Sequence, residues 1–163
     1  LTLGANMLLI GEKVDNFEKG YELLKEKLEN GEAFNQFKKL VEKQGGDVSY
    51  INSPDKFKKS KKTYEIRAES SGYLNQLKAL DIGLAAMLVG AGREKKGDEI
   101  LNEVGVIVKK KYGDYVNKGE MVARLHYNKD DDNFKEAVKK LKKAFIIKEN
   151  APDRKDLIFE IID

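Results

Sequence analysis

The 163-residue sequence contains no cysteine and no tryptophan, and it has one histidine and two prolines. Without cysteine, the chain can form neither a disulfide nor a thiolate zinc site, and it has no cysteine nucleophile. A single histidine excludes a metal site built from several imidazoles, and a serine–histidine triad would have to use His126. These absences remove several common catalytic arrangements before any motif is considered.

The excess of basic over acidic residues is small. Lysine and arginine number 31 against 28 acidic residues, which gives a net charge of +3. Duplex-binding proteins usually carry a concentrated basic face, so nucleic-acid binding is not the expected main function. Hydrophobic residues make up 40% of the chain, which is too many for a disordered protein and enough for one domain, alone or with an appendage.

The start of the chain carries no recognisable targeting segment. The apolar run Met7–Ile10 is far too short for a membrane span, and no basic segment precedes it as in a secretory signal. The sequence begins at Leu1 rather than at methionine, already in helical register. We therefore expect a segment of a longer protein, with a processed start or a disordered leader as the alternative.

Residues 1–50 show the spacing of amphipathic helices, with apolar residues at intervals of three and four in three runs. Asp15 precedes Glu18 at capping-box spacing and predicts the start of the second run. Glu32 begins the third, and Gly45–Gly46 offer a left-handed stop after it. We expect three short helices that edge a larger core.

The helical spacing of apolar residues is absent between residues 46 and 62. Pro54 and the basic run Lys56–Lys62 predict a connecting segment over residues 51–62. A basic run of this kind is usually a solvated loop, and contact with nucleic acid or a membrane is the alternative. Phe57 is the only aromatic residue within the run, and a surface that stacks on bases usually has several.

From Thr63 onward the apolar period changes to two, which predicts strands mixed with helices and an α+β fold. The many small residues of the helix expected from Asp81 to Val89 imply close packing against a sheet. The expected elements are strands at Thr63–Ala68, Tyr73–Leu77, Val104–Val108 (buried), Met121–Tyr127, Phe145–Lys148 and Leu157–Ile162, a helix from Asp81 to Val89, a hairpin over Tyr112–Glu120 and a helix over Asn133–Lys143.

A glycine-rich loop, with Gly90, Gly92 and Gly97, follows the Asp81 helix. A Rossmann phosphate loop follows a strand and opens a helix, whereas this loop follows a helix. A Walker loop needs lysine and then serine or threonine after its last glycine, and here Asp98 follows Gly97. Termination of the helix by glycine is the simpler explanation.

Arg93 lies in this loop and is one of only four arginines in the chain. A guanidinium on a flexible loop suits a carboxylate partner or an anionic ligand. Two interpretations therefore remain open: a structural ion pair, and a residue that faces a ligand or gates a cleft.

Two further sites invite a chemical interpretation. His126 is expected to be a packed or surface residue rather than a general base, because no serine lies in a recognisable nucleophile elbow. Asp130–Asp132 is expected to cap the following helix and to favour the positive end of its dipole. Metal binding by this triplet is the alternative.

The segment Gly113–Glu120 has the spacing G-D-x-V-x-K-G-E, the turn of hammerhead-type biotinyl and lipoyl carrier domains. Its glycines accept positive φ, and Val116 is expected to pack into the sheet. A carrier also needs a lysine at a protruding tip, flanked by methionine or alanine for biotin and by aspartate for lipoate. No Met-Lys-Met or Asp-Lys-Ala sequence occurs, so we expect the shape without the carrier function.

Several blocks together resemble the C-terminal third of pyrimidine-nucleoside phosphorylases, the family that includes thymidine phosphorylase. The blocks are Leu1-Thr2-Leu3-Gly4-Ala5-x-Met7, Phe37-x5-Lys43-Gln44-Gly45-Gly46-Asp47, Ala68-x3-Gly72-Tyr73, Ile82-Gly83-Leu84-Ala85-Ala86-Met87-Leu88-x-Gly90-Ala91-Gly92-Arg93, Val104-Gly105-Val106 and Lys109-Lys110-x2-Gly113-Asp114-x-Val116-x-Lys118-Gly119-Glu120. Their order and spacing extend through almost the whole chain.

The resemblance implies a domain organisation and a reaction. Residues 1–50 would be the terminal helices of a phosphate-binding α/β domain, 51–62 a linker, and 63–163 a C-terminal α/β-hammerhead domain. The parent enzyme would be a cytoplasmic homodimer in which phosphate attacks C1′ of a pyrimidine nucleoside and releases the free base and a pentose 1-phosphate. It would use no cofactor and no metal, since phosphate is a co-substrate.

The sequence departs from the family in one respect that matters for chemistry. The family's phosphate-binding loops and its base-binding arginine, serine and lysine have no counterpart here, so we expect no catalytic and no substrate-binding residue in this chain. The segment should then be inactive alone. The loop with Gly90, Gly92 and Arg93 is our one candidate for reaching the cleft between domains. A stand-alone biotinyl- or lipoyl-like hammerhead interaction module is the alternative function.

Overall fold

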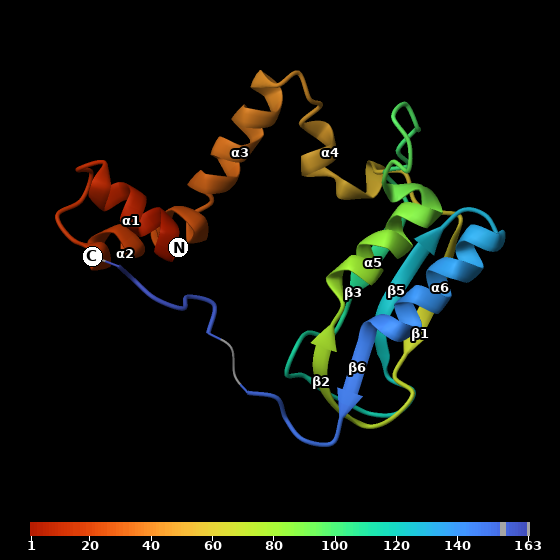
Figure 1. The fold of residues 1–163 in the computed structure, drawn as a ribbon. Helices are drawn as coiled ribbons and strands as arrows, with labels where there is room; N and C mark the ends of the chain where they lie inside the picture. Colours follow the sequence, from red (N-terminus) through yellow and green to blue (C-terminus); the bar gives the residue numbers. More distant parts are fainter. Residues whose placement is uncertain (154–155, 163) are drawn as a thin grey trace. The chain divides into compact units, whose positions relative to one another are not determined.

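The structure of the chain is a computed structural model that describes residues 1–153 and 156–162. It divides into two compact units, Leu1–Phe57 and Lys58–Asp163. The first unit contains helices, and the second combines helices with two small antiparallel sheets (Figure 1). The predicted α+β class is therefore confirmed.

The first unit is built from three main helices, as the apolar spacing predicts. They are α1 (Thr2–Ile10), α2 (Phe17–Glu29) and α3 (Glu32–Lys43), followed by a short helix α4 (Ser49–Asn52) and a single 3₁₀ turn η1 (Pro54–Lys56). Helices α1 and α2 pack against each other through Gly20, where a Cβ would lie only 3.1 Å from the carbonyl oxygen of Ala5. Of residues 1–57, all of them described, only these two are buried.

Some details of this unit differ from the prediction. The expected cap at Asp15 is wrong, because the Asn16 side chain accepts the hydrogen bond from the Lys19 backbone N–H at 2.9 Å. Aspartate and asparagine are equally good caps, so adjacent candidates cannot be separated by type. Asp15 instead pairs with the Lys19 ammonium at 2.6 Å. The expected left-handed stop is present, since Gly45 has a φ of +77°.

The second unit contains two three-stranded antiparallel sheets. In the first, β5 (Met121–Tyr127) lies between β1 (Lys62–Arg67) and β3 (Gly105–Val108). In the second, β2 (Gly72–Leu77) lies between β4 (Tyr115–Val116) and β6 (Phe145–Lys148).

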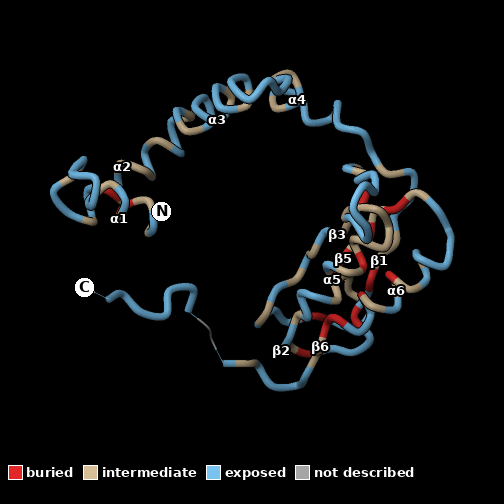
Figure 2. Tube along the Cα trace, turned by 45° about the horizontal axis from the view of Figure 1, so that its top comes forward, coloured by how far each residue is buried: buried red, intermediate tan, exposed pale blue. Residues whose placement is uncertain are grey.

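Two helices pack side by side against these strands. Helix α5 (Ala79–Ala86) continues into a π-helical turn η2 (Met87–Ala91) and contacts β3, while α6 (Asp132–Ala144) contacts β1 and β6. Figure 2 shows the buried residues gathered where the helices meet the strands. None of the helices in the described part of the chain is long and apolar enough to span a membrane. The largest fully buried side chains are Ile66, Leu74, Val116, Val122, Leu125 and Leu141.

Two expectations about strand pairing are wrong. Residues 112–120 do not form a hairpin, because β4 pairs with β2 while β3 and β5, its neighbours in sequence, pair with each other. The run Val104–Val108 is not a buried strand, since β3 lies at a sheet edge and Ile107 is 46% exposed. Strand order sets which strand is at the edge, and an apolar run does not report that order. Val116 is fully buried, as expected.

The boundaries of two other elements also differ. Helix α5 begins at Ala79, two residues before the expected start at Asp81. The predicted strand Leu157–Ile162 is wrong: these described residues form no strand, and the Leu157 side chain is 97% exposed. The chain ahead of them is held by two hydrogen bonds, from Asn75 Nδ2 to the carbonyl oxygen of Asn150 and from the Tyr112 hydroxyl to that of Asp153, each 3.0 Å.

Candidate functional site

The loop that carries Arg93 begins at Gly90 and is closed at its base by Leu101. The Leu101 backbone N–H donates to the carbonyl oxygen of Gly90 at 2.9 Å. Gly90 has a φ of +104°, and a Cβ at this position would lie 2.9 Å from Leu101 Cδ1. Both the backbone conformation and the close side chain therefore require glycine here. Gly92 is extended, with a φ of −146° and a ψ of 172°.

The loop has an internal hydrogen-bonded turn. One carboxylate oxygen of Asp98, Oδ2, accepts from the backbone N–H groups of Lys95 at 2.7 Å and Glu94 at 3.1 Å. The Asp98 backbone N–H donates in turn to the carbonyl oxygen of Lys95 at 3.2 Å. The residues that follow Arg93 are therefore held in a defined turn.

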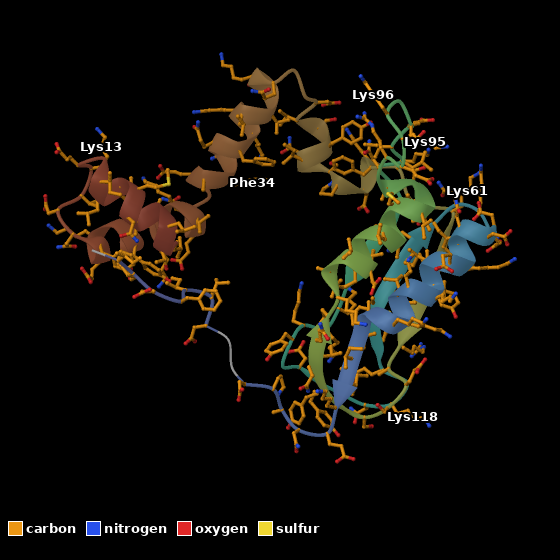
Figure 3. The ribbon with its side chains drawn as sticks, viewed as in Figure 1. Lys13, Phe34, Lys61, Lys95, Lys96 and Lys118 are labelled. Atoms are coloured by element: carbon orange, nitrogen blue, oxygen red, sulfur yellow. The ribbon has the colours of Figure 1, made fainter. Side chains whose placement is uncertain are left out.

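Arg93 is exposed at the start of this turn. Among the described residues, none forms an ion pair or a hydrogen bond with its side chain. Figure 3 shows Lys95 and Lys96 on the same loop, at the same end of the second unit as Lys61. Of the two interpretations of Arg93, the structural ion pair thus has no partner in the described part of the chain, and the role toward a ligand or a cleft stays a prediction.

His126 lies on β5 and contacts the segment that precedes β1. Its Nδ1 is 3.0 Å from Ser60 Oγ, which also lies 3.1 Å from the carbonyl oxygen of Lys62. Because the carbonyl can only accept, the hydroxyl proton is directed to Lys62, and the pattern assigns the His126 proton to Nδ1. Nε2 is buried without a partner among the described residues. Burial and the nearby Arg124 lower the pKa of His126, which favours the neutral ring.

A second polar cluster surrounds Glu103, just before β3. The Lys58 ammonium is 2.7 Å from Glu103 Oε1, and Asn128 Nδ2 donates to the same oxygen at 3.0 Å. The hydrogen bond from Lys58 is the largest cause of the lowered pKa of the Glu103 carboxyl. This cluster leaves no signal in the sequence, because its three members come from separate segments and share no spacing.

The acidic triplet before α6 has structural partners. Asp131 caps the helix by accepting from the Phe134 backbone N–H at 2.9 Å, which confirms the capping prediction. Asp130 pairs with the Lys62 ammonium and accepts from the Tyr127 hydroxyl. Within residues 1–153 and 156–162, no group of three or more histidine, aspartate or glutamate side chains could hold a metal ion.

The turn at Lys118 lies at the opposite end of the second unit from Lys95 and Lys96 (Figure 3). Its backbone is bonded on both sides: the Lys118 N–H donates to Ser71 Oγ at 2.9 Å, and the Gly119 N–H donates to the carbonyl oxygen of Ala68 at 2.8 Å. A carrier lysine requires a protruding tip, whereas the backbone of this turn is hydrogen-bonded to Ala68 and Ser71.

Comparison of the sequence with protein-family models and with curated proteins gives the same family of enzymes in both cases. Residues 73–148 match the family model of the pyrimidine nucleoside phosphorylase C-terminal domain. The chain is 39% identical over 151 residues to the pyrimidine-nucleoside phosphorylase of Staphylococcus haemolyticus (strain JCSC1435). The aligned region covers 93% of this chain and 34% of the relative. It is 37% identical over 147 residues to those of Staphylococcus aureus strains bovine RF122 and USA300, covering 90% of this chain and 34% of each. The chain thus spans about a third of the length of these curated relatives.

Proposed function

We propose that the chain corresponds to the C-terminal third of a pyrimidine-nucleoside phosphorylase and supplies this third to an enzyme of that activity. The enzyme transfers the pentosyl group of a pyrimidine nucleoside to phosphate, so that the products are the free base and a pentose 1-phosphate. The observation that carries the proposal is the 39% identity to the Staphylococcus haemolyticus enzyme over 93% of this chain.

The chain is proposed to be inactive by itself. Phosphorolysis is accelerated by holding phosphate against C1′ and by stabilising the leaving base. The resemblance assigns these groups to segments outside this sequence. Within the described residues, the one histidine is engaged with Ser60 and has a lowered pKa, which is consistent with a structural role.

The contribution of this chain to the reaction is assigned to the loop with Gly90, Gly92 and Arg93. The closed base of the loop and the turn around Asp98 hold the start of the loop in place. A guanidinium binds phosphate or carboxylate through two parallel N–H···O hydrogen bonds. In the cleft between domains, Arg93 would favour closure over the reacting groups, which excludes water from them.

The domain assignment is part of the same proposal. Residues 1–50 are assigned to the terminal helices of the phosphate-binding α/β domain, 51–62 to a linker and 63–163 to an α/β-hammerhead domain. The exposed apolar side chains of α1 and α3, such as Leu3, Met7 and Leu40, support the first assignment, because an apolar helix face normally packs against another element. The two small sheets support the last.

The assembly and location follow the resemblance. The enzyme is proposed to be a cytoplasmic homodimer that uses phosphate as co-substrate and needs neither a cofactor nor a metal. The alternative of a stand-alone hammerhead carrier or interaction module is not favoured, because the relatives are phosphorylases and the turn at Lys118 is bonded on both sides.

The test joins this chain to the N-terminal two-thirds of the Staphylococcus haemolyticus enzyme, in place of the part it matches. Phosphate-dependent release of uracil from uridine, or of thymine from thymidine, is measured for this chimera, for the 163-residue chain and for the truncated relative. We expect the chimera to be active and the two parts to be inactive separately. Turnover by the chain alone contradicts the proposal, as does a folded chimera that is inactive beside an active relative.

A further inference from the structure

Glu103 lies near the surface of the second unit, but its side chain is largely covered. Its side chain is 4% exposed, whereas that of its partner Lys58 is 74% exposed. An ion pair is strengthened where water is excluded, and a buried carboxylate that loses its partner is strongly disfavoured. The conformation around Glu103 therefore depends on a lysine that reaches it from the surface.

Lys58 belongs to the segment by which the chain enters the second unit. We call Lys58–Lys62 the entering segment, because Lys58 is the first residue of that unit. Three further contacts attach it to the end of β5 and the residues beyond: Ser60 Oγ lies 3.0 Å from His126 Nδ1, the Lys61 N–H donates to Asn128 Oδ1 at 2.9 Å, and Lys62 pairs with Asp130. Asn128 contacts both the entering segment and Glu103.

Glu103 is also close in sequence to the base of the Arg93 loop. The Val104 N–H donates to the carbonyl oxygen of Leu101 at 3.4 Å, and the Leu101 N–H donates to that of Gly90 at 2.9 Å. The ion pair of Lys58 with Glu103, the peptide bond from Glu103 to Val104, and the two backbone hydrogen bonds at Leu101 thus connect Lys58 to Gly90, where the loop begins.

We propose that Glu103 is a positioning residue that couples the entering segment to the Arg93 loop. When the chain shifts at its junction with the first unit, Lys58 shifts, and the Glu103 carboxylate must follow it or lose its only cationic partner among the described residues, keeping the hydrogen bond from Asn128. Movement of Glu103 changes the turn at Leu101 and so the base of the loop. The relevance of this coupling to catalysis rests on the proposed function, whereas the coupling itself is a property of this chain.

The test measures backbone hydrogen exchange, residue by residue, in the 163-residue chain and in Lys58→Ala. We expect the amides of Lys95 and Leu101, which are hydrogen-bonded at the turn and the base of the loop, to exchange roughly three- to tenfold faster in the variant. The amides of β5 keep their wild-type rates. Glu103→Gln, which retains an acceptor without the charge, should give a smaller increase.

The matched control is Lys135→Ala. Lys135 is as exposed as Lys58, at 73%, and its ion pair with Asp132 is also 2.7 Å long, but Asp132 is 96% exposed. Both variants remove one surface charge and one ion pair, and we expect the control to leave the loop amides unchanged. The proposal is overturned if Lys58→Ala leaves these amides at wild-type rates, if the control accelerates them equally, or if all amides of the second unit accelerate together. The measurement needs no substrate, so an inactive chimera would not affect its outcome.

Discussion

The Lys58 ammonium and the Glu103 carboxylate form an ion pair of 2.7 Å across the surface of the second unit, with the lysine side chain 74% exposed and the glutamate side chain 4% exposed. This difference in exposure distinguishes the pair from ion pairs on the helices, such as Lys135 with Asp132, in which both partners are exposed. An exposed pair adds little to stability, whereas a pair with one buried member constrains the backbone around that member.

The acid dependence of stability should reveal this pair. The hydrogen bond from Lys58 lowers the pKa of Glu103 below that of an unfolded glutamate, about 4.3. The contribution of the pair is therefore present above about pH 4.3 and is lost as the pH falls through the lowered pKa of the folded state. We expect urea unfolding to show a smaller free-energy difference between wild type and Lys58→Ala at pH 3 than at pH 7. An equal difference at both values would contradict the assignment.

The single histidine allows a direct titration. Burial, and then Arg124, lower the pKa of His126, so its ring resonances should titrate with a midpoint below the ordinary value of about 6.5. Because the unfolded histidine takes up a proton first, this group lowers stability as the pH falls from about 6.5 toward the folded pKa. Proton NMR of the chain gives the midpoint without assignment problems. A midpoint at or above 6.5 would show that the ring is not desolvated.

Two glycines near each other in sequence should respond in opposite directions to alanine. Gly90→Ala places a Cβ at a φ of +104° and 2.9 Å from Leu101 Cδ1, so we expect a loss of about 1–3 kcal/mol in the free energy of unfolding. Gly83 lies within α5 with no atom within 4 Å of an added Cβ, so Gly83→Ala should gain about 0.5–1 kcal/mol. Denaturant unfolding measures both. Similar effects of the same sign would show that the Gly90 conformation is not as described.

The core and the segment Leu157–Ile162, here called the tail, provide a second matched pair. Leu141 on α6 is fully buried, and Leu141→Ala should cost about 2–5 kcal/mol in the free energy of unfolding. Leu157 is 97% exposed, and Leu157→Ala should change it by less than about 0.5 kcal/mol. A large loss at Leu157 would indicate that the tail packs against the unit, as the predicted strand would have required.

Elements whose burial follows a local period can be predicted from the sequence. The helices α2, α3 and α6 and the strands β1 and β5 follow from the sequence, because each of them repeats its apolar residues at a regular interval on one face. The cap within Asp130–Asp132 is predictable for a similar reason, since a capping side chain contacts a backbone N–H only three residues away. These features depend on residues close together in the chain.

The features that were missed depend on partners far away in the sequence. The exposed edge of β3 and the pairing of β4 with β2 follow from strand order, which no local pattern reports. The apolar run Leu157–Ile162 suits a strand by composition, but no strand forms among these residues. Glu103 is an isolated acidic residue before an apolar run, and its importance is visible only when Lys58 and Asn128 are placed beside it.

Arg93 offers the most direct test of what this chain adds to an enzyme. In the chimera with the Staphylococcus haemolyticus enzyme, Arg93→Ala should lower kcat for phosphorolysis by roughly ten- to a hundredfold, because an anion contact that favours the closed state is lost. Arg93→Lys should recover only part of the rate, since an ammonium cannot form the two parallel hydrogen bonds of a guanidinium. The unfolding temperature should stay at the parent value, as no described residue pairs with Arg93. Lys96→Ala, on the same loop, is the control for loss of positive charge. An unchanged kcat in Arg93→Ala, or an equal loss of kcat in Lys96→Ala, would show that Arg93 has no specific role in the cleft.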